Sequence, residues 1–416
     1  MEIEKVLISI KNKVKHKISD KDKRASISAL KFIFALIQAI MVAKKNFSIA
    51  DLRRDVIAYT GVKICRSAFL DRIKTKFIVK KLYFVLETIN AEFQSFTRKE
   101  SINFLHKIGV TKIKAVDSSM VTLWDSLFLK FPGTFHHAAI KLHACIDLVS
   151  GSISWFNHTA GSTHDSQCFP SLRGAQKTLF IFDLGYWSYE LLIRIAEKKA
   201  FFLSRIKKSA TLKIEEIVKG VGKKHIGHDL LSLDFKRSRG KILEVLVNIS
   251  SDNRKLMCRA IGFWNPVERS YHWYLTNLDC DPKYIHQLYK LRWQVELAFK
   301  ACKSSINIDH MPTTDPYAVI TLLLVGIINY QLSILISESN PNKEKKKNGI
   351  ARSIQRAAKV TQVLIRSISR YIIDTTELGL NQIKINLDLL SDDLTDPNSR
   401  KRPSTLEVLD SRCSEI

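Results

Sequence analysis

Residues 289–303 read YKLRWQVELAFKACK, a segment in which four polar residues stand at unusual intervals. An α-helix turns by about 100° per residue, so Tyr289, Arg292, Glu296, Lys300 and Lys303 fall within an arc of roughly 80°. The apolar residues of the segment gather on the adjoining arc, which we expect to dock on a core. Taken alone, the pattern is also typical of a solvated helix face with an ordinary i,i+4 ion pair between Arg292 and Glu296.

Two acidic residues elsewhere in the chain change that interpretation. Asp117 lies inside the apolar stretch IKAVDSSMV and Asp183 follows the apolar run TLFIF, and both stretches are predicted as strands. A carboxylate on a buried strand is costly unless it is paired or binds a cation. Two such aspartates, with Glu296 on a helix packed against the same sheet, predict a site for divalent ions, because oxygen ligands suit Mg²⁺ or Mn²⁺. Two such ions can drive phosphoryl transfer.

The spacing Tyr-x2-Arg-x3-Glu-x6-Lys resembles the YREK signature of bacterial insertion-sequence transposases of the DDE class. In this resemblance Asp117, in VDSS, corresponds to the family's first aspartate, and Asp183, in DLGY, corresponds to its second. Leu184 stands where relatives often carry arginine, which departs from the family pattern. The resemblance is strong over about residues 100–335 and weak over the N-terminal helices.

The resemblance implies an α/β fold with a ribonuclease-H-like mixed sheet and flanking helices. A β-rich insertion would precede the glutamate helix, and an all-helical domain would form the N-terminus. The implied reaction is cut-and-paste transposition. The enzyme would nick DNA at the terminal inverted repeats of its own element, and the freed 3′-hydroxyl would attack the opposite strand and later the target DNA.

The resemblance also implies roles for two sets of residues. The catalytic residues, which would hold two Mg²⁺ ions with Mn²⁺ as an alternative, are Asp117, Asp183 and Glu296. The residues that would hold DNA phosphates are Tyr289, Arg292, Lys300 and Lys303. Lysine and arginine suit the second role because phosphate contacts position DNA without reading its sequence.

Changes in composition and in hydrophobic periodicity along the chain predict five segments. They are a helical DNA-binding domain (1–100), the first part of the catalytic core (101–206), a β-rich insertion (207–280), the rest of the core with the glutamate helix (281–337), and a basic helical region with a polar tail (338–416). Within the first segment, Ser48 is a predicted N-cap and Gly61 a predicted helix end. A basic helix follows, so residues 48–74 match a helix-turn-helix with Arg66 and Arg72 exposed. Unrelated short helix pairs share this pattern.

The charge of the chain favours a polyanionic partner. There are 66 Lys and Arg against 40 Asp and Glu, a net charge of +26, which is typical of nucleic-acid binding and also of a soluble basic protein from a Lys-rich proteome. The implied reaction predicts double-stranded DNA as the partner, both as inverted repeats and as target, and a homodimer assembled on paired ends.

Cysteine spacing and the N-terminal sequence predict a protein of the reducing cytoplasm, and the resemblance implies that it is bacterial and nucleoid-associated. The seven cysteines show no metal-binding or disulfide pattern, and the charged N-terminus lacks a signal-peptide apolar region. Residues 318–336 are apolar and long enough to span a bilayer. Polar residues interrupt this stretch, so we expect a buried core helix and no membrane partner.

Several other residues have two interpretations each. A role near the DNA strand competes with fold maintenance for residues in and after a predicted hairpin, namely Lys141, His143, Asp147, His164 and Asp165. Stacking on a flipped base competes with ordinary core packing for two residues of the insertion, namely Trp264 and Trp273. Two other functions also stay open for the whole chain: a ribonuclease-H-like nuclease without strand transfer, and a decayed or regulatory DNA-binding protein.

Overall fold

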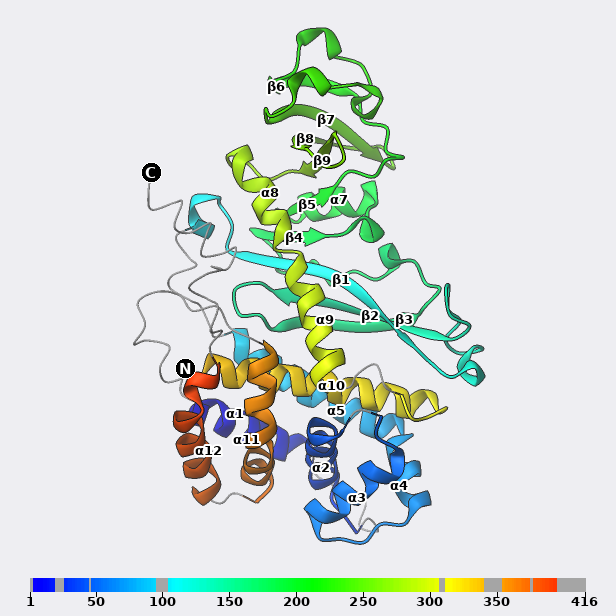
Figure 1. Ribbon diagram of the computed structural model, residues 1–416, viewed down its shortest axis with the longest axis vertical. Coiled ribbons are helices and arrows are strands. Elements are labelled where there is room, and N and C mark those ends of the chain that lie inside the picture. Colours follow the sequence, from blue (N-terminus) through cyan, green and yellow to red (C-terminus); the bar gives the residue numbers. More distant parts are fainter. Residues whose placement is uncertain are drawn as a thin grey trace.

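The computed structural model describes residues 3–18, 26–44, 46–94, 104–306, 311–339, 354–374 and 377–394. These residues form a strand-rich upper part that stands on a helical base (Figure 1). The helices α8 and α9 descend from the upper part to the base. The predicted α/β class with a helical N-terminal region is therefore confirmed.

One nine-stranded mixed sheet forms the upper part, in the order β3-β2-β1-β4-β5-β9-β8-β7-β6. The β1–β4 and β4–β5 pairs are parallel, and the other pairs are antiparallel. The β-rich segment joins this sheet through the pairing of β9 with β5. The strands are β1 (Lys112–Thr122), β2 (Ala139–Asp147), β3 (Ile153–Ala160), β4 (Thr178–Phe182), β5 (Phe201–Arg205), β6 (Ile214–Lys219), β7 (Leu243–Ser251), β8 (Arg254–Asn265) and β9 (Ser270–Thr276).

The two faces of the sheet pack into two separate hydrophobic cores. Successive residues of a strand point to opposite faces. In β1, Ala115 belongs to the core shared with α9 and the base, whereas Val116 belongs to the core on the other face, under α7 (Tyr189–Glu197). In β4, Ile181 and Phe182 divide in the same way. The next residue along each strand therefore faces α9.

Helices from both ends of the chain form the base. They are α1 (Ile3–Lys17), α2 (Ala29–Val42), α3 (Ile49–Thr60), α4 (Arg66–Ile73), α5 (Lys76–Gln94), α10 (Pro316–Glu338), α11 (Ile354–Asp374) and α12 (Glu377–Leu389). As predicted, Ser48 caps α3, through a reciprocal capping box with Asp51, and Gly61 ends it at a left-handed φ of 68°. The basic linker and the polar tail predicted within 338–416 fall outside the described residues, at 340–353 and from 395 onward.

Helix α10 runs through the base and is buried. Of the described helices it is the one long and apolar enough to cross a membrane, and 94% of its apolar window lies inside the structure. Its polar residues bond to neighbouring helices: Thr321 Oγ1 donates to Ile73 O at 2.8 Å, and Asn329 Nδ2 donates to Ile37 O at 3.1 Å. Bonds of this kind let polar groups lie in a core, and they explain the interruptions in the apolar sequence.

The segment that carries Glu296 consists of two helices, so the single continuous helix predicted from its periodicity is wrong. Helix α8 (Pro282–Lys290) begins after the N-cap Asp281, and α9 (Trp293–Ile306) begins after a two-residue break. At the break the Arg292 N–H donates to Tyr289 O at 3.0 Å, which is an i to i−3 bond. Because such bonds wind the chain more tightly than an α-helix does, the phase of about 100° per residue does not carry across the break.

Candidate active site

The pairing of β1 with β4 brings two of the predicted catalytic residues together. Val116 pairs with Phe182 at the end of the parallel ladder, and Asp117 and Asp183 follow directly. By strand alternation both aspartates continue onto the face that α9 covers. Asp183 has extended backbone angles (φ −83°, ψ 169°) and begins the 3-10 turn Leu184–Tyr186.

Asp117 is largely buried in a place where its charge is unfavourable. Its side chain is 15% exposed. Burial raises the pKa of the carboxyl to about 6; Arg292 acts against this rise, and the charges of Asp183 and Glu296 add to it. The Ser118 N–H donates to Asp117 Oδ1 at 2.8 Å. Because charges affect one another's pKa over short distances, these shifts place the three carboxylates in one neighbourhood.

Arg292 connects the sheet to α9. Its Nη1 lies 2.6 Å from Asp117 Oδ2, and its Nη2 lies 2.6 Å from Glu296 Oε1. The break between α8 and α9 places the guanidinium between these carboxylates. Its Nε is buried and has no hydrogen-bond partner among the described residues. Buried donors are usually paired, so this atom marks a position where a further acceptor would be favourable.

The donor chemistry of the site fits a divalent ion, because three carboxylates supply the oxygen ligands that Mg²⁺ and Mn²⁺ prefer. The carboxylates are not arranged to bind a metal ion directly, because Arg292 lies between Asp117 and Glu296 and pairs with both. Across the residues that the structure describes, no group of three or more His, Cys, Asp or Glu lies close enough to hold a metal ion. Metal binding by Asp117, Asp183 and Glu296 therefore stays a prediction.

The remaining residues predicted to hold phosphates lie along α8 and α9. Tyr289 packs against Tyr274 with ring centroids 5.1 Å apart, and burial raises the pKa of its hydroxyl. Lys303 reaches β1, where its Nζ donates to Met120 O at 3.0 Å. Lys300 is exposed on α9. Tyr289 and Lys303 thus help to hold α8 and α9 in place, and the charge of Asp183 also acts on the Tyr289 hydroxyl.

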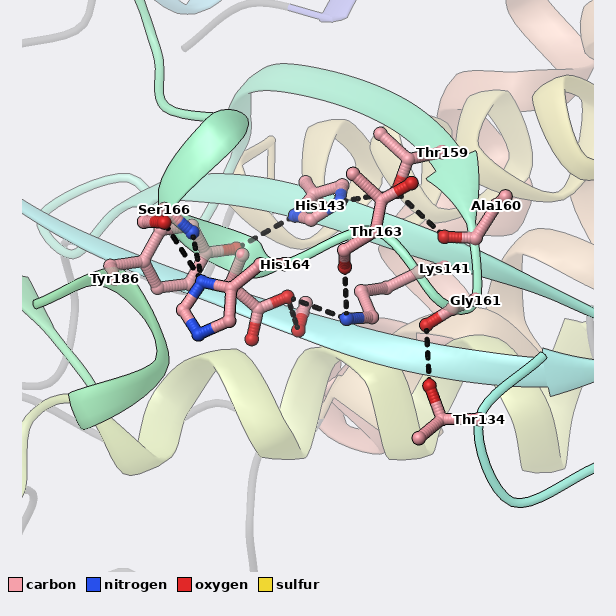
Figure 2. A network of polar contacts seen from close by, with 12 residues as sticks. Thr134, Lys141, His143, Thr159, Ala160, Gly161, Thr163, His164, Ser166 and Tyr186 are labelled. Atoms are coloured by element: carbon pink, nitrogen blue, oxygen red, sulfur yellow. Dashed lines mark hydrogen bonds and ion pairs between the residues drawn. The ribbon is translucent and has the colours of Figure 1, made fainter. Parts of the chain in front are cut away.

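A polar network lies on the other face of β1 (Figure 2). Lys141 Nζ donates to Thr163 O at 2.7 Å and forms an ion pair with Asp165 at 3.0 Å. His143 Nδ1 lies 2.9 Å from the Tyr186 hydroxyl. Burial lowers the pKa of His143 to about 4, so its ring is neutral near pH 7. Lys141 therefore bonds β2 to the turn around Asp165, and His143 bonds β2 to the turn that carries Tyr186.

His164 belongs to the same network in a local role. Its ring is exposed, and its Nδ1 accepts from the Ser166 N–H at 3.2 Å, which caps the 3-10 turn Asp165–Gln167. Tyr186, which lies in the turn after Asp183, was not among the residues predicted as functional, whereas Asp165 was a candidate together with His164. The sequence offers one signal for Asp165, namely its place beside His164 shortly after a strand.

The remaining candidates lie in the insertion and in the helical base. Trp273 is buried against Phe235, with ring centroids 5.5 Å apart, which fits core packing. Trp264 packs edge-on against another aromatic ring and lines a pocket of about 210 Å³. Arg66 is exposed at the start of α4. Arg72 is only partly exposed and lies over the Phe32 ring, so the prediction that it is exposed is wrong.

A mixed sheet with two adjacent aspartates under a helix that carries a glutamate defines a core of the DDE type. The chain belongs to the family described as Transposase DDE domain, whose model matches residues 110–332. It is 26% identical over 247 residues to the transposase for insertion sequence element IS231F of Bacillus thuringiensis subsp. israelensis, covering 49% of this chain and 51% of that protein.

Two further proteins show similarity. The chain is 25% identical over 238 residues to the transposase for insertion sequence element IS1151 of Clostridium perfringens, covering 47% of this chain and 50% of that protein. It spans about half the length of these curated relatives. The piggyBac transposase synaptic complex with hairpin DNA, solved by cryo-electron microscopy, aligns with a TM-score of 0.48 at 12% identity, covering 97% of this chain and 87% of that one.

Proposed function

We propose that this protein is a DNA transposase that binds the terminal inverted repeats of its own insertion sequence and catalyses strand cleavage and strand transfer. The observation that carries the proposal is the placement of Asp117 beside Asp183, under the helix that carries Glu296, inside a DDE transposase domain. The net charge of +26 supports a DNA partner. The cut-and-paste route, the YREK assignment and a homodimer on paired ends belong to the same proposal.

Asp117, Asp183 and Glu296 would hold Mg²⁺ or Mn²⁺, as two ions per site. When bound, the metal would activate the attacking oxygen and stabilise the leaving oxygen of the phosphodiester. The part of the protein is to hold the carboxylates on rigid elements, with the Ser118 N–H fixing one oxygen of Asp117 at 2.8 Å.

Arg292 would exchange its carboxylate partners for a DNA phosphate. Its buried Nε has no partner within the described residues, and a guanidinium offers a planar set of donors that matches phosphate oxygens. The neighbouring Lys300 and Lys303 add positive charge on the same helix, and Tyr289 would contact the terminal phosphates from α8. In the base, the α3–α4 pair with the exposed Arg66 would contribute to DNA binding.

The test is a cleavage assay with a labelled duplex that carries the inverted repeat flanking the gene, in Mg²⁺ or Mn²⁺, with Glu296→Gln beside the wild type. We expect wild-type nicking followed by a hairpin or a joined product. In Glu296→Gln, nicking should fall by more than the roughly 100-fold that loss of a residue supporting a metal ligand produces, while DNA binding persists.

Each other outcome has a distinct meaning. Binding without cleavage by the wild type in either metal would indicate a decayed or regulatory DNA-binding protein. Cleavage without any joined product would indicate a nuclease on the same core. Equal cleavage by Glu296→Gln would show that this carboxylate is not a ligand and would overturn the proposed site.

A further inference from the structure

The strand pairing brings the two proposed catalytic aspartates side by side but does not itself include them. The β1–β4 ladder ends at Val116 and Phe182, one residue before Asp117 and Asp183. Beyond that pair, β1 continues in the sheet, whereas the segment after β4 leaves the sheet and forms the 3-10 turn Leu184–Tyr186. Contacts outside the ladder must therefore hold the two segments in register.

Asp165 supplies such a contact. Its Oδ1 accepts a hydrogen bond from Ser118 Oγ at 3.1 Å and lies 3.0 Å from Lys141 Nζ. Ser118 follows Asp117 directly, and by strand alternation it points to the opposite face of the sheet. Figure 2 shows the network on one side of β1 and α9 on the other. Asp165 therefore contacts β1 from the face of the sheet opposite to Asp117, Asp183 and Glu296.

The second oxygen of Asp165 meets the turn after Asp183. A Cβ placed on Gly185 would lie 2.5 Å from Asp165 Oδ2, closer than real Cβ atoms approach other atoms. Glycine at this position therefore lets the carboxylate pack directly on the backbone of the turn. One side chain touches both segments whose separation the ladder leaves open.

A second chain of polar contacts holds the same turn. The Tyr186 hydroxyl and the Thr159 hydroxyl lie 2.9 Å from the two ring nitrogens of His143, Nδ1 and Nε2 respectively. Thr159 Oγ1 donates to Ala160 O at 3.2 Å, so it accepts from Nε2–H. His143 then carries its proton on Nε2, and Tyr186 donates to Nδ1. The Tyr186 hydroxyl therefore bonds the turn to His143 of β2, and His143 in turn bonds to Thr159 of β3.

We propose that Asp165 is a positioning residue that sets the separation of Asp117 and Asp183, through Ser118 on one side and the turn 184–186 on the other, with Lys141 holding its charge. The proposal deepens the proposed function and rests on it. Partners behind metal ligands orient those ligands, and their loss typically lowers metal affinity or activity by about 10–100-fold. Asp165 is occupied by Ser118 and Lys141, so it acts through the other two aspartates and is not itself a ligand.

The experiment compares the full-length wild type with Asp165→Asn, Ser118→Ala and the control Asp125→Asn. Asp125 is 83% exposed and lies 3.6 Å from His137 in a surface pair, so its substitution makes the same chemical change away from the network. Four quantities are measured: thermal unfolding, binding of the end duplex, Mn²⁺ binding to the protein followed by electron paramagnetic resonance, and the nicking rate at saturating DNA.

We expect Asp165→Asn to weaken Mn²⁺ binding by about 10–100-fold and to lower nicking in proportion, with binding of the end duplex within about twofold of the wild type. Excess Mn²⁺ should restore part of the nicking rate, which a general loss of folded protein would not allow. Asp125→Asn should match the wild type in all four quantities. A folded Asp165→Asn with wild-type Mn²⁺ affinity would overturn the proposal.

Ser118→Ala keeps the inference testable if Asp165→Asn does not fold. This variant removes one hydroxyl and leaves the ion pair of Asp165 with Lys141 in place, and we expect Mn²⁺ binding to weaken by about tenfold. Unchanged Mn²⁺ affinity in Ser118→Ala would count against the proposal. A wild type that binds Mn²⁺ but cuts no DNA would overturn the proposed function alone, whereas a wild type that binds no Mn²⁺ would overturn both.

Discussion

Two largely buried arginines in this protein hold carboxylates at the same distance, yet their surroundings differ. In the insertion, Arg259 Nε lies 2.6 Å from Glu244 Oε1, and its Nη1 donates to Leu278 O at 2.6 Å and to Cys280 O at 2.9 Å. In the candidate site, Arg292 lies 2.6 Å from a carboxylate on each side. The arginine side chains are 15% and 16% exposed, so burial alone does not distinguish the two sites.

The difference lies in how completely each arrangement satisfies its charges and donors. Arg259 holds one buried carboxylate, and backbone carbonyls accept its remaining bonds. Arg292 lies between two carboxylates with a third nearby, its buried Nε has no partner in the described part of the chain, and the pKa of Asp117 rises to about 6. A satisfied pair stabilises a fold, whereas an unsatisfied one is suited to a ligand that would complete it.

The largest expected effect comes from breaking the satisfied pair. Arg259→Met leaves Glu244 buried without a counter-charge, and we expect the free energy of unfolding to fall by about 3–5 kcal/mol. Urea unfolding followed by circular dichroism measures this loss. The control is Arg254→Met, which removes a partly exposed arginine 3.5 Å from Glu197 and should cost less than about 1 kcal/mol. A loss below 1 kcal/mol for Arg259→Met would show that the pair in the insertion is not structural.

Local sequence patterns are enough to locate several elements around the site, whereas the fold class and the roles of the site residues come from the resemblance that residues 289–303 carry. Alternation and apolar runs locate the strands around Asp117 and Asp183, and the caps at Ser48 and Asp281 stand directly in the sequence. These features depend on residues a few positions apart. Secondary structure of this kind follows from periodicity and capping without knowledge of the tertiary fold.

Features that depend on distant residues were missed. No glycine or proline marks the break before α9 in the sequence. Arg292, at the break, pairs with Asp117, 175 residues away. Asp165 likewise bonds to Ser118, 47 residues away. Only the pairing of strands brings such residues together, and a single sequence does not reveal that pairing.

The second expected effect is a gain in stability on removing the unfavourable charge of the site. The pKa of Asp117 is about 6 in the folded protein, above its ordinary value of 3.8. The folded state therefore binds more protons than the unfolded state between about pH 4 and 6, and stability falls as the pH rises through that window. Asp117→Asn removes this loss and should raise the free energy of unfolding by about 1–3 kcal/mol at pH 7.

Urea unfolding of Asp117→Asn and of the wild type at pH 7 and pH 4 measures this gain. The advantage of the variant should shrink towards zero at pH 4, where the wild-type carboxyl is protonated in the folded state. A variant that is less stable than the wild type at pH 7 would contradict the prediction, because it would show that Arg292 stabilises Asp117 more than burial destabilises it.

The smallest expected effect tests whether Arg292 controls the protonation of Asp117. Arg292 lowers the pKa of this carboxyl, so in Arg292→Met the pH at which Mn²⁺ binding is half lost should rise by about one unit. At pH 8, where Asp117 is ionised in both proteins, the variant should bind Mn²⁺ at least as tightly, because a positive charge that competes with the metal is gone. The two affinity curves should therefore cross between pH 6 and pH 8, whereas Arg254→Met should follow the wild type throughout. Parallel curves, with the variant weaker at every pH, would mean that Arg292 shapes the site as Arg259 shapes the insertion, and the distinction between the two arginines would disappear.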